Sequence, residues 1–295
     1  MTPSAAPAAL ASLDLASADL ANAHRANAHL ANAQRANADL ERRFGGLRRL
    51  YGDSGYERLR AASMAVVGLG GVGSWAAEAL ARCGVARLVL IDLDHVSESN
   101  INRQVQASGA TLGAHKGHAL RERIADIHPG CDVQVVDAFV EPGNWPALLP
   151  AAVDVLIDAC DQMRAKLTLA SWALSARVPL VCVGAAGGKR EAQRVEVADL
   201  GETTHDPLLA SLRQRLRKEA GAPRSGAMGL RCVFSRETVL APVDVADGEA
   251  STDGSLNCHG YGSTVTVTGT FGMVAAGEAI RQLLTAGLGS EGSER

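Results

Sequence analysis

Apolar positions along this chain fall in short runs that are separated by amphipathic stretches. Residues 64–67 form one apolar run and residues 87–91 a second, each long enough for one buried strand. Between them, residues 75–83 are rich in alanine and end at Gly84, as a helix terminated by glycine does. The pattern predicts a β-α-β unit that ends at Asp92.

The same alternation continues through the rest of the chain. Helical patterns recur four times, over residues 111–127, 144–149, 164–175 and 208–218. Strand patterns occur between them, over residues 132–139, 153–157, 179–183 and 193–197. This order predicts an α/β fold with a Rossmann-like, doubly wound, mainly parallel sheet and helices on both faces. The C-terminal part is expected to form an extension that completes the sheet.

The apolar segment 263–284 is the one stretch with a hydropathy near that of a membrane span. Glu278 and Arg281 interrupt it, so membrane association is disfavoured. Threonines alternate with valine and glycine in its first half. We therefore predict a strand or turn there, followed from Ala275 by a helix of the core.

Composition narrows the class of protein further. Hydrophobic residues make up 47% of the chain and aromatic residues only 3%, so the core must be mostly aliphatic. A net charge of −3 gives no general case for nucleic-acid binding, and any RNA contact must come from a local patch. The six cysteines form no Cys-x-x-Cys pair, so no structural zinc is expected. Scattered thiols and the absence of a secretory signal favour a cytoplasmic protein.

The first 40 residues differ in composition from the rest. From Ala18 a five-residue unit repeats, in a form that resembles pentapeptide-repeat sequences. Five units are too few to bury a core by stacking, and a period of five keeps no apolar face on a helix. We predict that residues 1–40 form a mobile, low-complexity arm and that residues 41–295 form the catalytic domain.

Glycines follow the first predicted strand in the spacing G-x-G-x-x-G, as Gly68, Gly70 and Gly73, with Gly71 between them. Such a turn lets a phosphate approach bare backbone, and the helix that follows directs its positive end at the anion. Asp92 ends the second strand, where a carboxylate can accept a ribose hydroxyl. Together these features predict nucleotide binding.

The polar residues after Asp92 argue against a nicotinamide-dependent dehydrogenase. Asp94, Asn100 and Arg103 follow just past the strand, and Lys116 comes soon after them. Ligands of open α/β sheets bind at this edge, and two cations there suit phosphoryl or nucleotidyl transfer. A further strand leads into Asp158-Ala-Cys-Asp161, where an aspartate is well placed to hold Mg²⁺.

At this point the sequence resembles the ubiquitin-activating-enzyme-like adenylyltransferases over roughly residues 41–284. The motifs that match, in order, are Gly-Leu-Gly-Gly-Val-Gly, Asp92-Leu-Asp94, Ser-Asn100-Ile-Asn-Arg103-Gln, the Gly-x-x-Lys that ends at Lys116, and Asp158-Ala-Cys-Asp161. Within that family it looks most like the tRNA threonylcarbamoyladenosine dehydratases. The narrower features include Arg-Phe-Gly-Gly at 43–46, Gly-Ala-Ala-Gly-Gly at 184–188 and Arg-Cys-Val-Phe-Ser at 231–235.

The resemblance implies an ATP-dependent enzyme that cyclises threonylcarbamoyl-adenosine next to the anticodon of a tRNA. It implies ATP on the glycine turn, Mg²⁺ held with help from Asp161, and charge stabilisation by Arg103 and Lys116. It also implies a homodimer in which an N-terminal arginine reaches the partner's ATP, with Arg49 preferred over Arg43. A sulfur-transfer protein is a further partner that the resemblance allows.

Several alternatives stay open at the level of sequence. The same adenylation could activate the C-terminal glycine of a ubiquitin-like sulfur-carrier protein, although those enzymes often carry zinc-binding Cys-x-x-Cys pairs. A non-catalytic nucleotide-binding scaffold is a second alternative. The basic segment 213–218 beside a Gly- and Pro-rich loop favours RNA, although a solvated helix face explains it equally well. Cys232 is more simply a buried strand thiol than a nucleophile.

Overall fold

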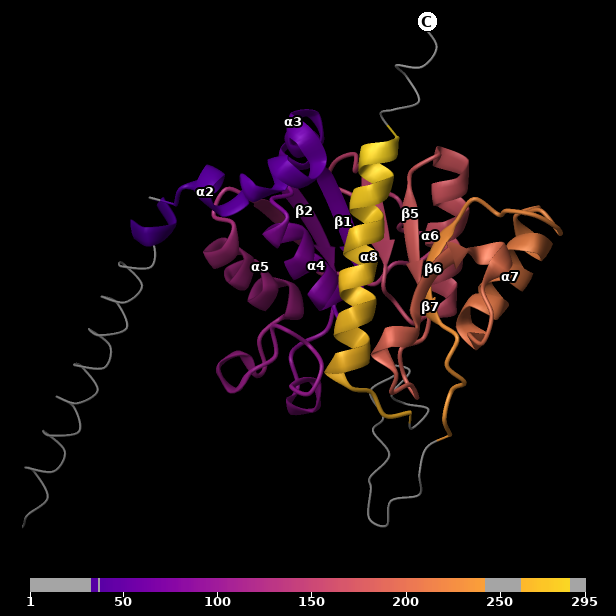
Figure 1. The fold of residues 1–295 in the computed structure, drawn as a ribbon. Helices are drawn as coiled ribbons and strands as arrows, with labels where there is room; N and C mark the ends of the chain where they lie inside the picture. The colour runs from indigo at the N-terminus through magenta and orange to yellow at the C-terminus, as the bar shows by residue number, and fades with distance from the viewer. Residues whose placement is uncertain (1–32, 37, 242–260, 287–295) are drawn as a thin grey trace, which may run out of the picture.

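Seven strands form a single sheet in this computed structural model, which describes residues 33–36, 38–241 and 261–286 (Figure 1). The strand order is β3-β2-β1-β4-β5-β7-β6. The strands are β1 (Ser63–Val67), β2 (Arg87–Ile91), β3 (Asp132–Val136), β4 (Val155–Asp158), β5 (Leu180–Val183), β6 (Val195–Asp199) and β7 (Arg231–Ser235). Every neighbouring pair is parallel except β6 and β7. The α/β, mainly parallel fold is therefore confirmed.

Helices cover both faces of the sheet. The helices are α2 (Leu40–Phe44), α3 (Gly46–Ala61), α4 (Gly73–Arg82), α5 (Lys116–Ile127), α6 (Met163–Ala176), α7 (Pro207–Glu219) and α8 (Val265–Thr285). Helices α4, α5 and α8 contribute to one apolar core, and α6 and α7 contribute to the other (Figure 1).

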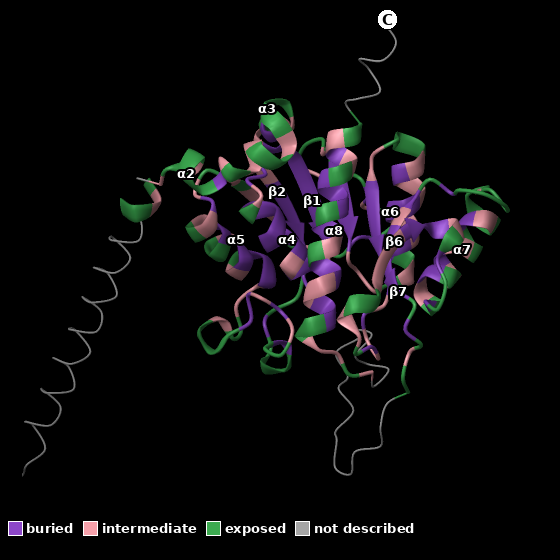
Figure 2. Cartoon of the chain, viewed as in Figure 1, coloured by how far each residue is buried: buried purple, intermediate pink, exposed green. Residues whose placement is uncertain are grey.

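Successive residues of the central strands alternate between these two cores. Met64 and Val66 of β1 face one core, while Ala65 and Val67 face the other. The central strands are accordingly buried along their whole length (Figure 2). Strands buried on both faces read as continuous apolar runs, which is why the sequence pattern located them.

Three predicted elements need correction. The helix predicted from Thr111 begins at Lys116, because a turn with Gly113 at φ +77° separates it from a short 3-10 helix. Residues 144–149 form turns and not a helix. The side chain of Asn144 bonds the backbone of Phe139 and Glu141, and Pro146 offers no N–H to a helix. Strand β3 ends at Val136 and not at residue 139.

A further correction, beyond these three, concerns the C-terminal apolar segment. Its alternating threonines are part of one continuous helix, α8, and do not form a strand or turn. Thr270 donates its hydroxyl to the Thr266 carbonyl one turn back, which satisfies a polar group inside an apolar helix. Helix α8 packs closely on α4, since a Cβ at Gly272 would lie 2.5 Å from the Val72 carbonyl oxygen. Tertiary packing here overrides the strand propensity of valine and threonine. Among the described residues, no helix combines the length and apolarity needed to cross a bilayer.

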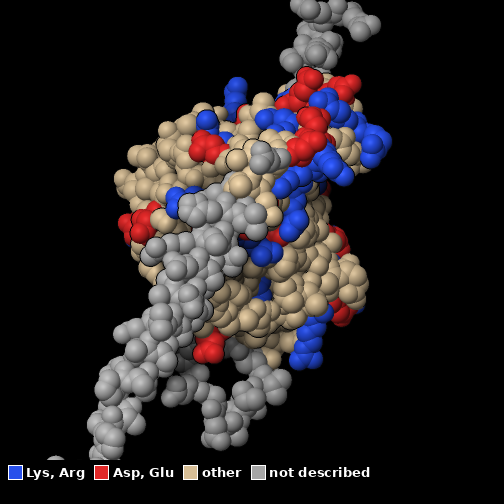
Figure 3. Space-filling model, turned by 90° about the vertical axis from the view of Figure 1, so that its left-hand side faces the viewer, with Lys and Arg blue, Asp and Glu red and all other residues tan. Residues whose placement is uncertain are grey.

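Most of the predicted N-terminal arm lies outside the described residues. Its last part contacts α5, because Arg35 donates to the Asp126 carboxylate at 2.7 Å. On the side of the molecule where α2 and α5 lie, basic and acidic side chains are interspersed (Figure 3). The boundary at residue 40 stays a prediction.

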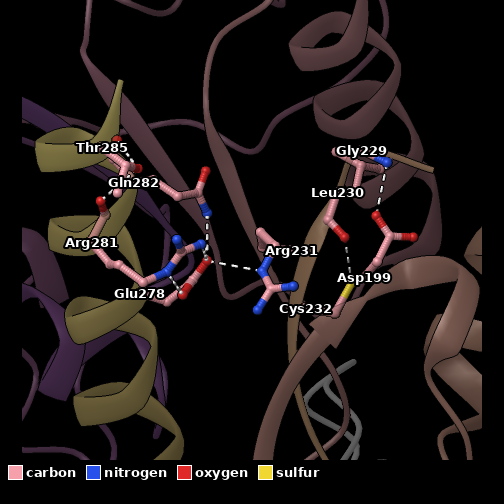
Figure 4. A network of polar contacts seen from close by, with 9 residues as sticks. All are labelled: Asp199, Gly229, Leu230, Arg231, Cys232, Glu278, Arg281, Gln282 and Thr285. Carbon is pink, nitrogen blue, oxygen red and sulfur yellow. Dashed lines mark hydrogen bonds and ion pairs between the residues drawn. The ribbon is translucent and has the colours of Figure 1, made fainter. Parts of the chain in front are cut away.

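A buried carboxylate joins α8 to β7 (Figure 4). Glu278 accepts from Arg231 of β7 at 3.0 Å and from Arg281 at 2.6 Å. Cys232, the next residue of β7, is fully buried, and its thiol donates to the Leu230 carbonyl at 3.8 Å. These contacts give Cys232 the environment of a strand thiol within the core.

Candidate active site

A cavity of about 530 Å³ opens at the carboxyl edge of the sheet. Val67, Ile91 and Val183, the last apolar residues of β1, β2 and β5, line it. Ligands of open α/β sheets bind in such a crevice, where the strand order reverses. A smaller cavity, of about 340 Å³, lies at the start of α7 and contains none of the predicted site residues.

The glycine turn forms one wall of the larger cavity, which Gly68, Gly70 and Gly71 line. Gly68 has φ +86°, a conformation that L side chains rarely adopt. Gly73 does not line the cavity and is the first residue of α4. A Cβ at Gly73 would lie 1.8 Å from the Gly68 carbonyl oxygen, so only glycine fits between the turn and the helix. The third glycine of the motif therefore serves close packing.

Asp92 lines the cavity at the end of β2 and is buried, with 7% of its surface exposed. Its carboxylate accepts from the backbone N–H of Leu69 at 2.5 Å and of Asp94 at 2.8 Å. Burial raises the pKa of Asp92, and the ammonium of Lys116 opposes this rise. The two backbone contacts fix the carboxylate against the glycine turn.

Arg103 also lines the cavity, from the loop that follows β2. Its guanidinium donates to the Ser99 carbonyl at 2.7 Å and to the Asn102 side chain at 3.0 Å. The loop is tied to α4 because Trp75 Nε1 donates to the Arg103 carbonyl at 2.9 Å. Asn100 is buried in the same loop and accepts from the backbone of Ser97. The loop is thus held by its own side chains and by α4.

Lys116 is the first residue of α5 and is almost buried, with 8% of its side chain exposed. Its ammonium donates to the Asp94 carboxylate at 2.7 Å, and both residues line the cavity. An ammonium has three donors, so the ion pair with Asp94 leaves capacity for a phosphate oxygen.

The two aspartates that follow β4 have different environments. Asp161 lines the cavity. Asp158 is fully buried and pairs with Lys166 of α6, whose ammonium donates to it at 2.7 Å. Lys166 also donates to the Val183 carbonyl at 2.9 Å, so it ties the ends of β4 and β5 together. Of the two carboxylates, Asp161 is the one that lines the cavity.

The predicted N-terminal arginines do not line the cavity. Arg43 donates to the carbonyls of Asp126 and Ile127 at the end of α5, both at 2.8 Å. Arg49 is exposed on α3. Arg43 is therefore engaged in capping α5, and the role expected of Arg49 stays a prediction.

Sequence reasoning missed several residues of this site. Lys166 carried no signal, since a lysine in an apolar helix pattern reads as a surface residue. The side-chain amide of Gln106 donates to the Leu69 carbonyl at 3.0 Å and so stabilises the glycine turn. His95 lines the cavity beside Asp94 and was equally unmarked. Only the position of these residues next to recognised motifs could have indicated them.

Comparison with known proteins assigns the family. The model of the ThiF family matches residues 43–293. The chain belongs to the ThiF family.

Within the ThiF family, the chain is similar over most of its length to tRNA threonylcarbamoyladenosine dehydratases. It is 40% identical over 250 residues to the tRNA threonylcarbamoyladenosine dehydratase of Escherichia coli, covering 82% of this chain and 93% of that protein. A crystal structure of the E. coli enzyme in complex with ATP has a TM-score of 0.77 and covers 86% of this chain and 99% of that one. By contrast, the similarity to the E. coli molybdopterin-synthase adenylyltransferase, 37% identical, covers 43% of this chain and 51% of that protein.

Proposed function

We propose that this chain is an ATP-dependent dehydratase that cyclises N6-threonylcarbamoyladenosine next to the anticodon in tRNA. The observation that carries the proposal is the cavity itself. It brings the glycine turn, Asp92, Arg103, Lys116 and Asp161 together at one edge of the sheet. The E. coli dehydratase is 40% identical and 93% covered, whereas the molybdopterin-synthase adenylyltransferases of E. coli and Haemophilus influenzae are 37% and 31% identical and 51% and 76% covered. This difference supports the tRNA acceptor over a sulfur-carrier protein.

In this proposal ATP lies over Gly68, Gly70 and Gly71, with its phosphates near the N-terminus of α4. That arrangement offers backbone N–H groups and the positive end of a helix to the anion. The ribose hydroxyls lie at Asp92, whose carboxylate is already oriented by two backbone amides. A crystal structure of the E. coli relative in complex with AMP, 38% identical with a TM-score of 0.76, supports an adenine nucleotide as the ligand.

The first step joins the threonyl carboxylate of the modified adenosine to the α-phosphorus, and pyrophosphate leaves. Arg103 and Lys116 stabilise the negative charge that develops on the phosphate oxygens, and Asn100 helps to orient them. Asp161 would hold Mg²⁺ together with phosphate oxygens. Among the described residues no group of three or more His, Cys, Asp or Glu could ligate a metal alone. One carboxylate combined with nucleotide phosphates is a common mode of Mg²⁺ binding, in which the ion neutralises phosphate charge.

The second step closes the ring. A nitrogen of the same substituent attacks the activated acyl carbon, the bond to the phosphate oxygen breaks, and AMP leaves with the oxygen of the lost water. Nucleophile and electrophile belong to one molecule, so the cavity needs only to hold them in contact. No protein thiol is required, which agrees with the burial of Cys232 in the core.

We infer that the working unit is a homodimer. Arg49 does not line the cavity of its own subunit, and it extends from an exposed part of α3, next to Leu50, which is 69% exposed. An exposed leucine beside an exposed arginine suits a protein interface. In the dimer, Arg49 reaches the ATP phosphates of the partner subunit.

Helix α7 is the surface that we assign to tRNA. Arg215 and Lys218 of α7 are exposed, and Arg224 is exposed in the loop that follows. Arg213 and Arg217 instead donate to backbone carbonyls and hold the helix and loop together. The three exposed cations can contact phosphates, and their loss would weaken tRNA binding and its salt dependence.

The described cysteines are all free thiols, which supports a reducing, cytoplasmic location.

The test is nucleoside mass spectrometry on tRNA that bears threonylcarbamoyl-adenosine, incubated with the protein and ATP·Mg²⁺. The expected result is a modified nucleoside lighter by one water. Arg103→Ala and Asp161→Ala should abolish the change. Arg194→Ala, which removes an exposed arginine that pairs only locally with Glu191, is the matched control and should retain it.

An unchanged nucleoside would contradict the proposal. ATP–pyrophosphate exchange that appears only when a ubiquitin-like sulfur-carrier protein is added would assign the chain to the alternative acceptor. The sulfur-transfer partner stays a prediction, and the same assay addresses it by comparing turnover with and without a persulfide-carrying protein.

A further inference from the structure

Helix α5 begins with an unusual cap. The residue before its first turn is His115, whereas Ser, Thr, Asp and Asn are the usual side chains at this position. The His115 Nδ1 atom accepts from the backbone N–H of Gly117 at 3.2 Å. The Nε2 atom lies 3.1 Å from an Asp137 carboxylate oxygen. Nδ1 must therefore carry the lone pair while Nε2 carries the hydrogen, which is one defined tautomer of the neutral ring.

The imidazole of His115 is held firmly in this orientation. Only 11% of its side chain is exposed, and its ring meets those of His95 and His118 edge-on, with centroids 5.5 and 5.1 Å away. A Cβ at Gly117 would lie 3.3 Å from the ring and 2.6 Å from a methyl group of Val135. A side chain at Gly117 would displace the ring, so the glycine makes room for the cap.

The residue that this cap holds in place is Lys116. Its backbone N–H donates to the Asp94 carbonyl at 3.0 Å, and its ammonium donates to the Asp94 carboxylate at 2.7 Å. His115 and His95 pair through their backbones, so the start of α5 is bound to the segment that follows β2. The direction in which Lys116 leaves the helix thus depends on two supports, the contact with Asp94 and the cap from His115.

We propose that His115 is a positioning residue: its neutral imidazole fixes the first turn of α5 and thereby holds the Lys116 ammonium at the phosphates of the bound nucleotide. This rests on the proposed function only in assigning Lys116 to the phosphates. His115 does not line the cavity, whereas Lys116 and Asp94 do.

The positioning requires an unprotonated Nδ1, since a proton there removes the acceptor of the cap. The ring faces Asp137 after β3, His95 after β2 and His118 on α5. His115→Asn keeps a side-chain acceptor for the cap.

The experiment measures the Kd for ATP·Mg²⁺ by calorimetry with the full chain, without RNA. His115→Ala should weaken binding about fivefold at pH 7.5, the equivalent of one helix cap at about 1 kcal/mol. His115→Asn should bind within about twofold of the wild type, because asparagine caps a helix as well as histidine does here. Arg194→Ala, which removes an exposed side chain that pairs with Glu191 and does not contact the His115 ring, is the control and should bind as the wild type does.

A double-mutant cycle separates positioning from general stability. In a Lys116→Ala background, His115→Ala should weaken ATP binding no further, since the group through which it acts is gone. An additive loss in that background, or a fivefold loss that asparagine does not restore, would overturn the proposal. A His115→Ala variant that binds ATP normally would do the same.

The outcome also distinguishes the two proposals. A wild-type chain that binds no ATP would overturn both. The expected pattern of affinities together with an unchanged tRNA nucleoside would support the role of His115 and refute only the acceptor proposed above.

Discussion

The ion pair between Asp158 and Lys166 offers the sharpest test of how this site is supported. Both side chains are fully buried, and they lie at the ends of β4 and β5 beneath the cavity. Lys166→Met removes the ammonium and fills most of its space with an apolar side chain of similar length. It leaves the carboxylate of Asp158 in the core without its cation.

The expected loss can be worked out from the contacts that remain. Breaking a buried pair by removing one partner costs about 3 to 5 kcal/mol, because the other charge stays buried. Asp158 keeps the backbone N–H of Cys160 at 3.2 Å and the thiols of Cys160 and Cys182 at 2.8 and 3.6 Å. These donors place the loss at the lower end, near 3 kcal/mol. For a domain of this size that lowers Tm by roughly 6 to 12 °C.

The pH of the measurement follows from the sign of the pKa shift. Burial lowers the pKa of Lys166 and is the largest single effect, but the Asp158 carboxylate and the neighbouring Cys160 and Cys182 together raise it more, so the net shift is upward. A group whose pKa is raised on folding contributes its full stability below its unfolded value and loses it only as the pH rises through the folded value. Urea unfolding at pH 7 therefore records the whole contribution.

The control is the double variant Asp158→Leu, Lys166→Met. It removes both charges together, so it should recover most of the stability that the single variant loses. A single variant that loses less than about 1 kcal/mol of unfolding free energy would refute the reasoning, because an uncompensated charge in the core should destabilise the fold by more than that. A double variant less stable than the single one would equally contradict it.

Three further predictions concern Gly73, Glu278 and His128. Gly73→Ala places a Cβ 1.8 Å from the Gly68 carbonyl oxygen, so the glycine turn must move. A displacement of about 1 Å lowers turnover by roughly a hundredfold, which is the loss that we expect. A variant with normal steady-state kinetics would contradict the geometry. Burial raises the pKa of Glu278, but Arg281 and Arg231 together lower it more. The ionised Glu278 therefore stabilises the fold above its unfolded pKa, and this stabilisation is lost as the pH falls below about 4.5. Glu278→Gln should lose about 1 to 2 kcal/mol of unfolding free energy at pH 7, and its stability in urea unfolding should depend less on acid pH. Burial and the nearby Arg60 lower the pKa of His128 to about 4, so the unfolded chain binds a proton at a higher pH than the folded chain does. The free energy of unfolding should therefore fall as the pH drops from about 6.5 to 4. His128→Gln should remove this pH dependence, and an unchanged pH dependence would show that another group titrates.

Much of the fold could be predicted from the sequence because the sheet is buried on both faces. A strand in that position is a continuous apolar run, and β1, β2, β4 and β5 were all located within two residues. The grouping of the site follows from the same fact. Parallel strands end at one edge, so residues that trail successive strands, such as Arg103 and Asp161, line the same cavity.

The parts that could not be predicted depend on packing and side-chain pairing that the apolar pattern does not encode. The threonines of α8 favour a strand locally, and only packing against α4 makes them helical. Nothing near Lys166 in the sequence indicates that its partner is Asp158. The short-range pattern also misplaced the start of α5, because Thr111 is a usual capping residue whereas the residue that caps the helix is His115.

The position of α8 has a consequence for how the protein is made. This helix contributes Val267, Phe271 and Ala275 to the core that also contains the centre of the sheet. It is the last described element of the chain, whereas β1 and α4, with which it shares that core, lie near the start of the described fold. While the nascent chain lacks α8, this face of the sheet is covered less completely and part of its apolar surface stays exposed. Transiently exposed apolar surface favours aggregation, so the packing of α8 also protects the nucleotide-binding half during synthesis.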